Sequence, residues 1–134
     1  MSGESSDFLI RSAAFLGSTG VGLGAFGAHA LKPTLEKQKN GVENWKTAVT
    51  YQLLHATALL ALSALASSNQ AKTLGQNFSQ RCAKSGTLMT IGSMLFSGSI
   101  YGLVLDIGPR KVLGPLTPLG GLLMMIGWVM LGFL

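Results

Sequence analysis

Charged side chains are absent from four long windows of the sequence. The windows are 20 to 25 residues long and together hold most of the chain: residues 12–31, 47–71, 85–105 and 112–134. A helix of about 20 mostly apolar residues crosses the hydrocarbon core of a bilayer, which is about 30 Å thick. A soluble domain of this size rarely carries four such runs, so the pattern predicts an integral membrane protein.

We therefore predict an all-α fold, an integral membrane four-helix bundle that forms one domain over residues 1–134. The ends of the spans are expected where charged residues and the turn-forming Gly and Pro residues gather. The expected spans are about residues 12–31, 47–66, 85–105 and 113–134. Residues 106–111 leave room only for a hairpin, so the third and fourth spans are expected to be antiparallel neighbours.

The polar connection after the first span has a helical pattern of its own. Residues 32–46 carry six charged side chains, and Asn40-Gly41 interrupts them. The apolar residues in and just after this connection fall on one helical stripe: Leu35, Val42, Trp45 and Val49. The stripe predicts a short amphipathic interfacial helix that runs into the second span near Glu43. Trp45 is expected at the boundary between water and lipid, where Trp is enriched.

The fourth span is predicted to begin irregularly, because Pro109, Pro115 and Pro118 fall within ten residues. Thr117 followed by Pro118 is typical of a helix N-cap and the first helical position. A regular helix is then expected only from Pro118 onward, with residues 113–116 non-helical. Non-helical backbone at membrane depth has to be buried in protein or line a wet cavity.

Composition agrees with a membrane protein and adds a packing surface. Only 11% of the residues are charged, and 18 are glycine. Gly20, Gly24 and Gly27 share one face of the first span, and the spacing of Gly20 and Gly24 lets two helix backbones approach closely in lipid. We predict that these three glycines are helix-packing positions. The alternative is the close approach of a cofactor or a lipid.

Several function classes are disfavoured by the remaining residues. The formal net charge is +5, but the basic residues are scattered and no aromatic residues interleave with them, so we expect no nucleic-acid partner. Cys82 is the single cysteine and can form neither an internal disulfide nor a zinc cluster. The chain offers no convincing Ser, His and acid set for nucleophilic catalysis. We expect no catalytic residue and no enzyme activity.

Four groups of short motifs follow one another along the chain: Gly24-Ala25-Phe26-Gly27-Ala28-His29, Thr47-Ala48-Val49-x-Tyr51-Gln52-x-x-His55-Ala56, Phe96-Ser97-Gly98-Ser99-x-Tyr101, and Gly114-Pro115-Leu116-Thr117-Pro118-Leu119-Gly120-Gly121 with Gly127-Trp128. In this order and spacing they resemble the domain of unknown function 423 family, whose eukaryotic branch is the transmembrane protein 256 group. The resemblance covers about Phe15 to Leu134. It implies a four-span membrane protein of bacteria and, in eukaryotes, of mitochondria. It implies no established activity.

Polar side chains inside the predicted spans are the candidate functional residues, because such groups are expensive in lipid. We predict one buried polar cluster: His29, Tyr51, Gln52, His55, Ser97 and Tyr101. The favoured interpretation is hydrogen bonding between helices, and a path for protons or a solute is the second. The two histidines are expected to differ in depth by about 9 Å, which argues against a shared metal or haem. Asp106, at a span end, is expected to pair with Arg110.

Taken together, these features predict a non-enzymatic structural or accessory subunit of a larger membrane complex. For a eukaryotic chain, the resemblance points to a respiratory-type assembly in the mitochondrial inner membrane, and for a bacterial chain to the plasma membrane. The alternative is a small transporter or channel that uses a polar face formed by His55, Tyr51 and Gln52. We expect no cofactor and no metal, and we expect bound membrane lipids. The expected partners are other membrane subunits or, in the alternative, further copies of the chain in a homo-oligomer.

Overall fold

The computed structural model describes residues 2–133, and these residues form six α-helices. Four helices are long: α1 (Ser2–Ala28), α3 (Gly41–Ser67), α5 (Gln76–Val104) and α6 (Arg110–Phe133). Two are short: α2 (Lys32–Leu35) and α4 (Asn69–Leu74). Each long helix is long and apolar enough to cross a membrane. At 1.5 Å per residue they measure about 36 to 44 Å, so the predicted four-helix membrane bundle is confirmed.

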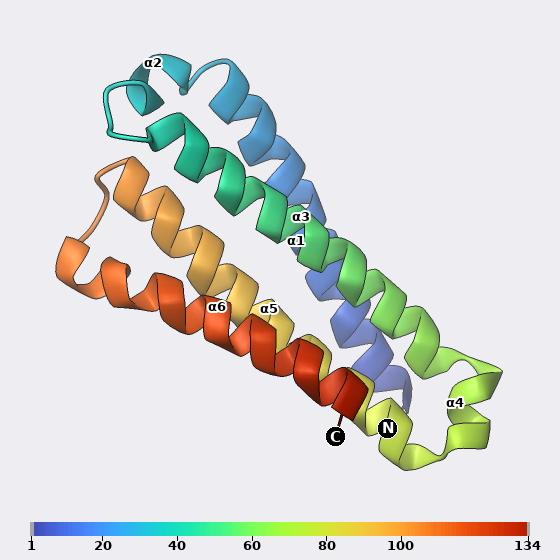
Figure 1. Cartoon of the computed structure of the whole chain (residues 1–134). Coiled ribbons are helices and arrows are strands. Elements are labelled where there is room, and N and C mark those ends of the chain that lie inside the picture. The colour runs from blue at the N-terminus through green and yellow to red at the C-terminus, as the bar shows by residue number, and fades with distance from the viewer. Residues whose placement is uncertain (1, 134) are drawn as a thin grey trace.

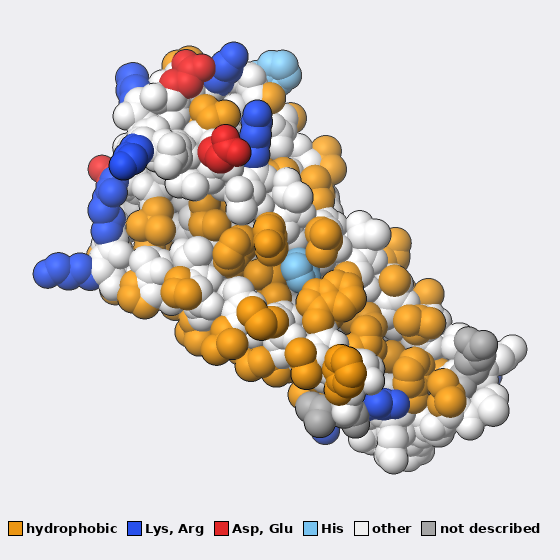
Figure 2. Space-filling model, viewed as in Figure 1, with side chains coloured by type: hydrophobic (Ala, Val, Ile, Leu, Met, Phe, Trp, Pro, Cys, Tyr) orange, Lys and Arg blue, Asp and Glu red, His pale blue; other side chains and the backbone are white. Residues whose placement is uncertain are grey.

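The four long helices are arranged as two antiparallel pairs (Figure 1). Helix α1 packs along α3, and α6 packs along α5, while α3 and α5 join the two pairs through the middle of the molecule. Both ends of the chain lie at the same end of the bundle as α4. Charged side chains gather at the opposite end, around α2 and the α5–α6 turn (Figure 2). The visible face between the two ends of the bundle is largely apolar.

Two buried apolar clusters lie at different positions along the length of the bundle. The cluster nearer α4 includes Leu9, Leu59 and Met89, and the cluster nearer α2 includes Leu35 and Trp45. Each cluster brings together side chains from at least two elements, which removes apolar surface from the lipid or water around the protein. The positions between the two clusters on α3 and α5 are partly polar, and they form the candidate site described below.

The helices extend beyond the predicted spans. Helix α1 begins at Ser2, ten residues before the predicted first span, and α5 begins at Gln76, nine residues before the predicted third span at residue 85. At its other end α1 stops at Ala28, three residues short of the predicted end at residue 31. The uncharged windows mark the apolar part of each helix, and polar residues continue the helix outside it. The segment from residue 67 to 84 is therefore mostly helical, with α4 and the first turns of α5 separated by Gly75, whose φ is +87°.

The surface helix after the first span is shorter than expected. Helix α2 has four residues, and Asn40 adopts a left-handed φ of 56° that separates it from α3. Trp45 does not face lipid as a residue of an aromatic belt would, because it is only 2% exposed; its depth at the boundary between water and lipid stays a prediction. Its indole N–H donates to the carbonyl oxygen of Leu23 at 2.9 Å, and the ring occupies the space that a side chain at Gly27 would fill.

The predicted irregular beginning of the fourth span is also wrong. Helix α6 is continuous from Arg110, with Pro115 and Pro118 inside it. Each proline removes one backbone hydrogen bond, but such losses are tolerated in membrane helices when neighbouring helices and Ser or Thr side chains compensate. Thr117 is not an N-cap: its hydroxyl donates to the carbonyl oxygen of Leu113 at 3.4 Å, one turn earlier in the same helix.

The turn between α5 and α6 has a defined end structure. Asp106 has a left-handed φ of 57°, the N–H of Ile107 donates to the carbonyl oxygen of Gly102 at 2.8 Å, and the Asp106 N–H donates to Leu103 at 3.4 Å. This pair of bonds is the Schellman arrangement that closes many helix C-termini. The Arg110 guanidinium lies 3.0 Å from the Asp106 carboxylate, so the predicted ion pair is confirmed.

Candidate functional site

Four of the predicted polar residues lie on the two central helices, and we call them the central polar band: Gln52 and His55 of α3, and Ser97 and Tyr101 of α5. Gln52, His55 and Ser97 are buried, with 4%, 3% and 1% of their surface exposed. Tyr101 is half-buried. Gln52, His55 and Ser97 lie between the two apolar clusters, and Tyr101 packs against the cluster nearer α2. The polar groups of the band therefore depend on other protein groups for hydrogen bonds.

Gln52 joins three helices through its side-chain amide. Its Nε2 donates to the carbonyl oxygen of Leu16 at 3.0 Å and to the hydroxyl oxygen of Thr19 at 2.8 Å, both on α1. Its Oε1 accepts from the Tyr101 hydroxyl of α5 at 2.8 Å. The tyrosine ring in turn packs on Trp45, with 4.6 Å between ring centroids. Both amide hydrogens and the amide oxygen of Gln52 are thus used inside the protein.

His55 connects α3 with α6. Its Nδ1 lies 2.8 Å from the carbonyl oxygen of Tyr51, and its Nε2 lies 3.2 Å from the indole nitrogen of Trp128. A carbonyl oxygen can only accept a hydrogen bond and an indole N–H can only donate one. The two partners therefore select the neutral imidazole with its proton on Nδ1. In this state both ring nitrogens are occupied by protein groups.

Hydroxyl groups make further links between the helices. Ser97 of α5 donates to the carbonyl oxygen of Ala48 on α3 at 2.7 Å. Ser99 and Thr117 bring their hydroxyl oxygens to 2.7 Å and so join α5 to α6. Both interactions run from one helix to another and therefore help to hold the bundle together. Two buried serines differ, because their hydroxyl oxygens have no hydrogen-bond partner within residues 2–133: Ser85 and Ser93.

Two members of the predicted cluster lie outside it. His29 follows the last residue of α1 and is exposed, so the expectation that it is buried with His55 is wrong. The helix ends at Ala28, which places His29 in the turn before α2 instead of inside the span. Tyr51 lies beside the band but is 44% exposed. Its ring contacts Phe96 at 4.9 Å between centroids, and its backbone carbonyl, not its hydroxyl, bonds to His55.

The three glycines predicted as packing positions in the first span all face α3. A Cβ at Gly20 would lie 2.8 Å from Leu53 Cδ2, and one at Gly24 would lie 3.3 Å from Val49 Cγ1. A Cβ at Gly27 would overlap the Trp45 indole. Real Cβ atoms essentially never approach as closely as those at Gly20 and Gly27 would, and the contact at Gly24 is tighter than most real ones, so these glycines let α1 approach α3.

A second glycine contact is absent from the sequence-based predictions. Gly92 of α5 faces Gly120 of α6: a Cβ at Gly92 would lie 2.7 Å from the Gly120 carbonyl oxygen, and a Cβ at Gly120 would overlap the backbone nitrogen of Phe96. Gly127 continues this contact, since its Cβ would lie 3.0 Å from the Ser85 carbonyl oxygen. Gly120 and Gly127 are seven residues apart, on one helix face, and this spacing is the signal that the sequence offers.

Chemically, the arrangement provides hydrogen bonds and close packing. Within residues 2–133, no group of three or more His, Cys, Asp or Glu residues is placed to hold a metal ion. The central polar band contains no carboxylate. Its donors and acceptors are directed at backbone carbonyls and at side chains of neighbouring helices.

Comparisons with known proteins place this architecture in a family. The family model described as "Protein of unknown function (DUF423)" matches residues 23–121. A UPF0382 membrane protein of the fission yeast Schizosaccharomyces pombe is 39% identical over 119 residues, which cover 87% of this chain and 91% of the yeast protein. No solved structure matches the chain.

Bacterial relatives have similar identities. A UPF0382 membrane protein of Staphylococcus aureus is 40% identical over 111 residues, covering 83% of this chain and 80% of the relative. The UPF0382 membrane protein YwdK of Bacillus subtilis is 37% identical over 111 residues, covering 83% and 81%. The family match reaches all four long helices, at least in part, and includes the whole central polar band. The chain is an integral membrane protein and belongs to the DUF423 family.

Proposed function

We propose that this protein is a non-enzymatic structural subunit that packs against other membrane proteins in a larger complex. The observation that carries the proposal is the internal bonding of the central polar band. Gln52 uses its amide nitrogen and oxygen for three hydrogen bonds, and His55 uses both ring nitrogens. Polar groups bonded in this way hold helices together and leave little capacity for a solute.

A transporter or channel, the alternative function, requires polar groups along an open path. Two hollows lie at the end of the bundle near α4, and none of the residues that line them belongs to the central polar band. The residues around His55 instead include Trp128 and Tyr51, both aromatic. The interior near His55 therefore favours packing over conduction.

The outer surface offers positions where a partner helix can bind. Tyr51 and Trp128 are 44% and 46% exposed and flank His55 on the face between α3 and α6. This apolar face is visible in Figure 2. The Tyr51 hydroxyl has no hydrogen-bond partner within residues 2–133, although Tyr51 lies near the middle of α3. A neighbouring membrane helix with a polar side chain would supply the missing partner.

We further propose that a eukaryotic chain of this kind works in the mitochondrial inner membrane and a bacterial one in the plasma membrane. Relatives that share most of the chain occur both in a yeast and in bacteria. The mitochondrial inner membrane is the eukaryotic counterpart of a bacterial plasma membrane. Respiratory complexes are large assemblies found in both, so we propose a respiratory-type complex as the partner.

Native extraction tests this function. Membranes solubilised in a mild detergent are separated on a native gel, and the proteins that migrate with the chain are identified by mass spectrometry. We expect migration with a large complex at fixed stoichiometry. Tyr51→Phe, which removes the unpartnered hydroxyl, is expected to weaken this association.

Thr57→Val is the matched control, because the Thr57 hydroxyl already donates to the Leu53 carbonyl oxygen of its own helix at 3.0 Å. It is expected to leave the association unchanged. Migration of the wild-type chain alone, or as a small homo-oligomer, contradicts the proposal. That result would favour transport and direct flux measurements to His55.

A further inference from the structure

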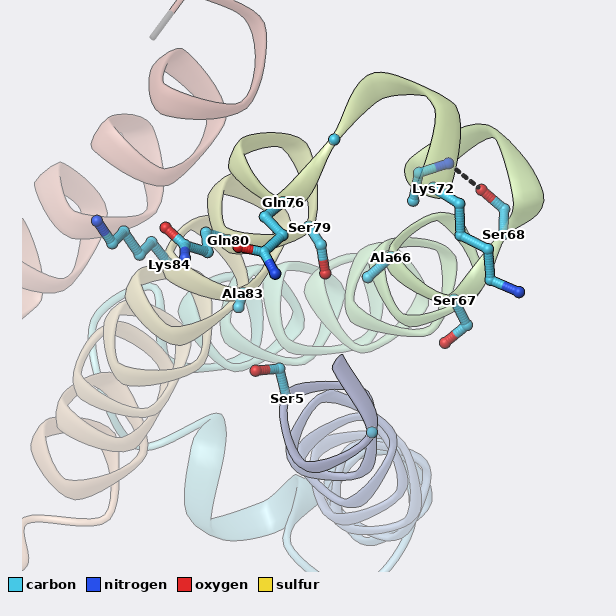
Figure 3. A pocket seen from close by; sticks show the side chains of 13 residues that line it. Ser5, Ala66, Ser67, Ser68, Lys72, Gln76, Ser79, Gln80, Ala83 and Lys84 are labelled. Atoms are coloured by element: carbon cyan, nitrogen blue, oxygen red, sulfur yellow. Dashed lines mark hydrogen bonds between the residues drawn. The ribbon is translucent and has the colours of Figure 1, made fainter. Parts of the chain in front are cut away.

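A hollow of about 750 Å³ opens at the end of the bundle near α4, and we call it the α4 cavity. It lies among the first turn of α1, the last turn of α3, α4 and the first turns of α5. Figure 3 shows Gln76 and Ser79 of α5 pointing into the space above Ser5 of α1. The volume falls within the range of about 300 to 1,000 Å³ that is usual for small-ligand sites.

The lining of the α4 cavity favours an anion. Lys72 and Lys84 lie at its opposite ends, with their side chains extending outward (Figure 3), and none of the residues that line it is acidic. Residues 67–84 carry three basic residues and no acidic one. The acidic residues of the first turns of α1, Glu4 and Asp7, are not part of the lining.

Neighbouring features add donors and positive charge. A second hollow of about 520 Å³ shares Gln80 and Lys84 with the α4 cavity and adds Arg81. Helix α5 begins at the cavity, and its N-cap, Gly75, supplies no side chain to accept from the first N–H groups. The C-terminal carbonyls of α3 are partly satisfied, because the Ser68 hydroxyl donates to the Leu65 oxygen at 2.7 Å.

The α4 cavity lies where a membrane surface is expected. Ala66, at the end of the second predicted span, forms part of one wall, and Lys84 precedes the uncharged window that begins at residue 85. Basic side chains at this depth meet the phosphate groups of lipids, and each contributes about 1 kcal/mol of attraction to an anionic surface. Phosphate oxygens also accept hydrogen bonds from Ser hydroxyls, Gln amides and Lys ammonium groups.

We propose that the α4 cavity binds a phosphate group, held between Lys72 and Lys84 and hydrogen-bonded by Ser79 and Gln76. Two sources share this chemistry: the headgroup of an anionic phospholipid and a soluble phosphate. The position at the membrane surface suits a headgroup, whose acyl chains would run along the apolar outer face of the bundle. The lysines can turn inward because both side chains are long and exposed.

The test uses the full chain, purified in a mild non-ionic detergent and examined by native mass spectrometry. Phosphatidylglycerol is added as the anionic probe and phosphatidylcholine as the zwitterionic one. We expect the wild type to retain phosphatidylglycerol at least about fivefold better than phosphatidylcholine, as two lysine contacts of about 1 kcal/mol each would allow. The double variant Lys72→Gln/Lys84→Gln is expected to lose this preference. The matched control is Lys37→Gln/Lys39→Gln, which removes two exposed lysines from the opposite end of the bundle.

A third variant separates binding in the cavity from attraction to a basic surface. Ser79→Phe fills the hollow without changing any charge, and we expect it to lower phosphatidylglycerol retention as much as the double lysine variant does. Equal retention by all variants overturns the proposal. Full retention by Ser79→Phe together with loss in the lysine variant also overturns it, because only surface charge would then matter.

Inorganic phosphate distinguishes the two sources. Line broadening in ³¹P NMR measures its binding to the same proteins. Phosphate binding that depends on Lys72, Lys84 and Ser79, without selective retention of phosphatidylglycerol, assigns the site to a soluble phosphate. Selective lipid retention that depends on the same residues assigns it to a headgroup. Neither kind of binding in the wild type overturns the proposal.

Discussion

The central polar band and the α4 cavity use the same types of side chain in different ways. Gln52 in the band is 4% exposed and bonds to two other helices, whereas Gln80 is exposed and lines a hollow. Ser97 bonds to a backbone carbonyl of α3, whereas Ser79 points into open space. A polar residue in a membrane protein therefore indicates a binding site only when protein groups do not already occupy its donors and acceptors.

The largest loss of stability is expected at the Gly92–Gly120 contact between α5 and α6. Gly120→Ala places a Cβ against the backbone of Phe96 and 2.6 Å from the Gly92 oxygen, and neither backbone can turn aside. We expect the free energy of unfolding to fall by about 3 kcal/mol, as for overpacked cores. Thermal unfolding in detergent measures this change.

The neighbouring residue provides the matched control for that variant. A Cβ at Gly121 would lie 3.8 Å from the Phe96 ring, an ordinary contact. Gly121→Ala is expected to leave the protein at least as stable as the wild type, since Ala is the better helix former by up to about 1 kcal/mol. If both substitutions destabilise the protein to a similar extent, the close α5–α6 contact at Gly120 is not the reason for the loss.

The next effect directly compares the two regions. Gln52→Leu removes three hydrogen bonds of the band, each worth about 0.6 kcal/mol on average within a membrane. We expect a loss of about 2 kcal/mol in unfolding free energy. Gln80→Leu, at the α4 cavity, is expected to change it by less than about 0.5 kcal/mol. Chemical denaturation of both variants in the same detergent checks this, and equal losses would erase the distinction between band and cavity.

A smaller effect is expected at the link between α3 and α6. Trp128→Phe keeps an aromatic ring but removes the N–H that bonds to His55 Nε2 at 3.2 Å. We expect a loss of about 0.6 to 1.7 kcal/mol in stability. Imidazole ¹⁵N NMR should show the Nδ1-protonated neutral form of His55 in the wild type and a mixture of tautomers in the variant. A wild-type His55 protonated on Nε2 would contradict the assigned hydrogen bonds.

The smallest effect is expected for an ion pair outside both regions. Arg110→Gln breaks the contact with Asp106, but the two side chains are 60% and 62% exposed. Such pairs contribute about 0.3 to 0.5 kcal/mol. The melting temperature should therefore stay close to that of Lys111→Gln, a control at the adjacent residue that no ion pair among the described residues includes. A loss above about 1 kcal/mol, the upper end for exposed pairs, would show that the turn depends on this pair.

Much of the fold is predictable from where charges are missing. Four uncharged windows of adequate length predict four spans, because unpaired charges are excluded from lipid. Helix ends are less predictable: the Ser-, Asn- and Gln-rich segment before residue 85 looks like a loop, yet α5 begins at Gln76. Pro115 and Pro118 favour a broken helix by local rules, and packing against α5 keeps α6 continuous instead.

The candidate site is less predictable than the fold. Helical spacing places Tyr51 and His55 on one face, but it does not say which neighbour covers each of them. The partner of His55 is Trp128, which is 73 positions away in the sequence. Trp45 has the sequence position of a boundary residue, yet it is buried, with its ring in the space left by Gly27 and against the Tyr101 ring. Contacts between helices that are far apart in the sequence determine what covers His55 and Trp45. The local pattern of a single sequence does not show these contacts.

The paired glycines of α5 and α6 also limit how this sequence can change over time. Where a large and a small side chain meet, growth of one can be offset by shrinkage of the other. Gly92 and Gly120 already present the smallest residue on both sides of the contact. No second substitution at the facing glycine can make room for an added side chain. A larger residue at either position therefore requires α5 and α6 to move apart. A stepwise exchange of volume between the two positions is not open to this pair.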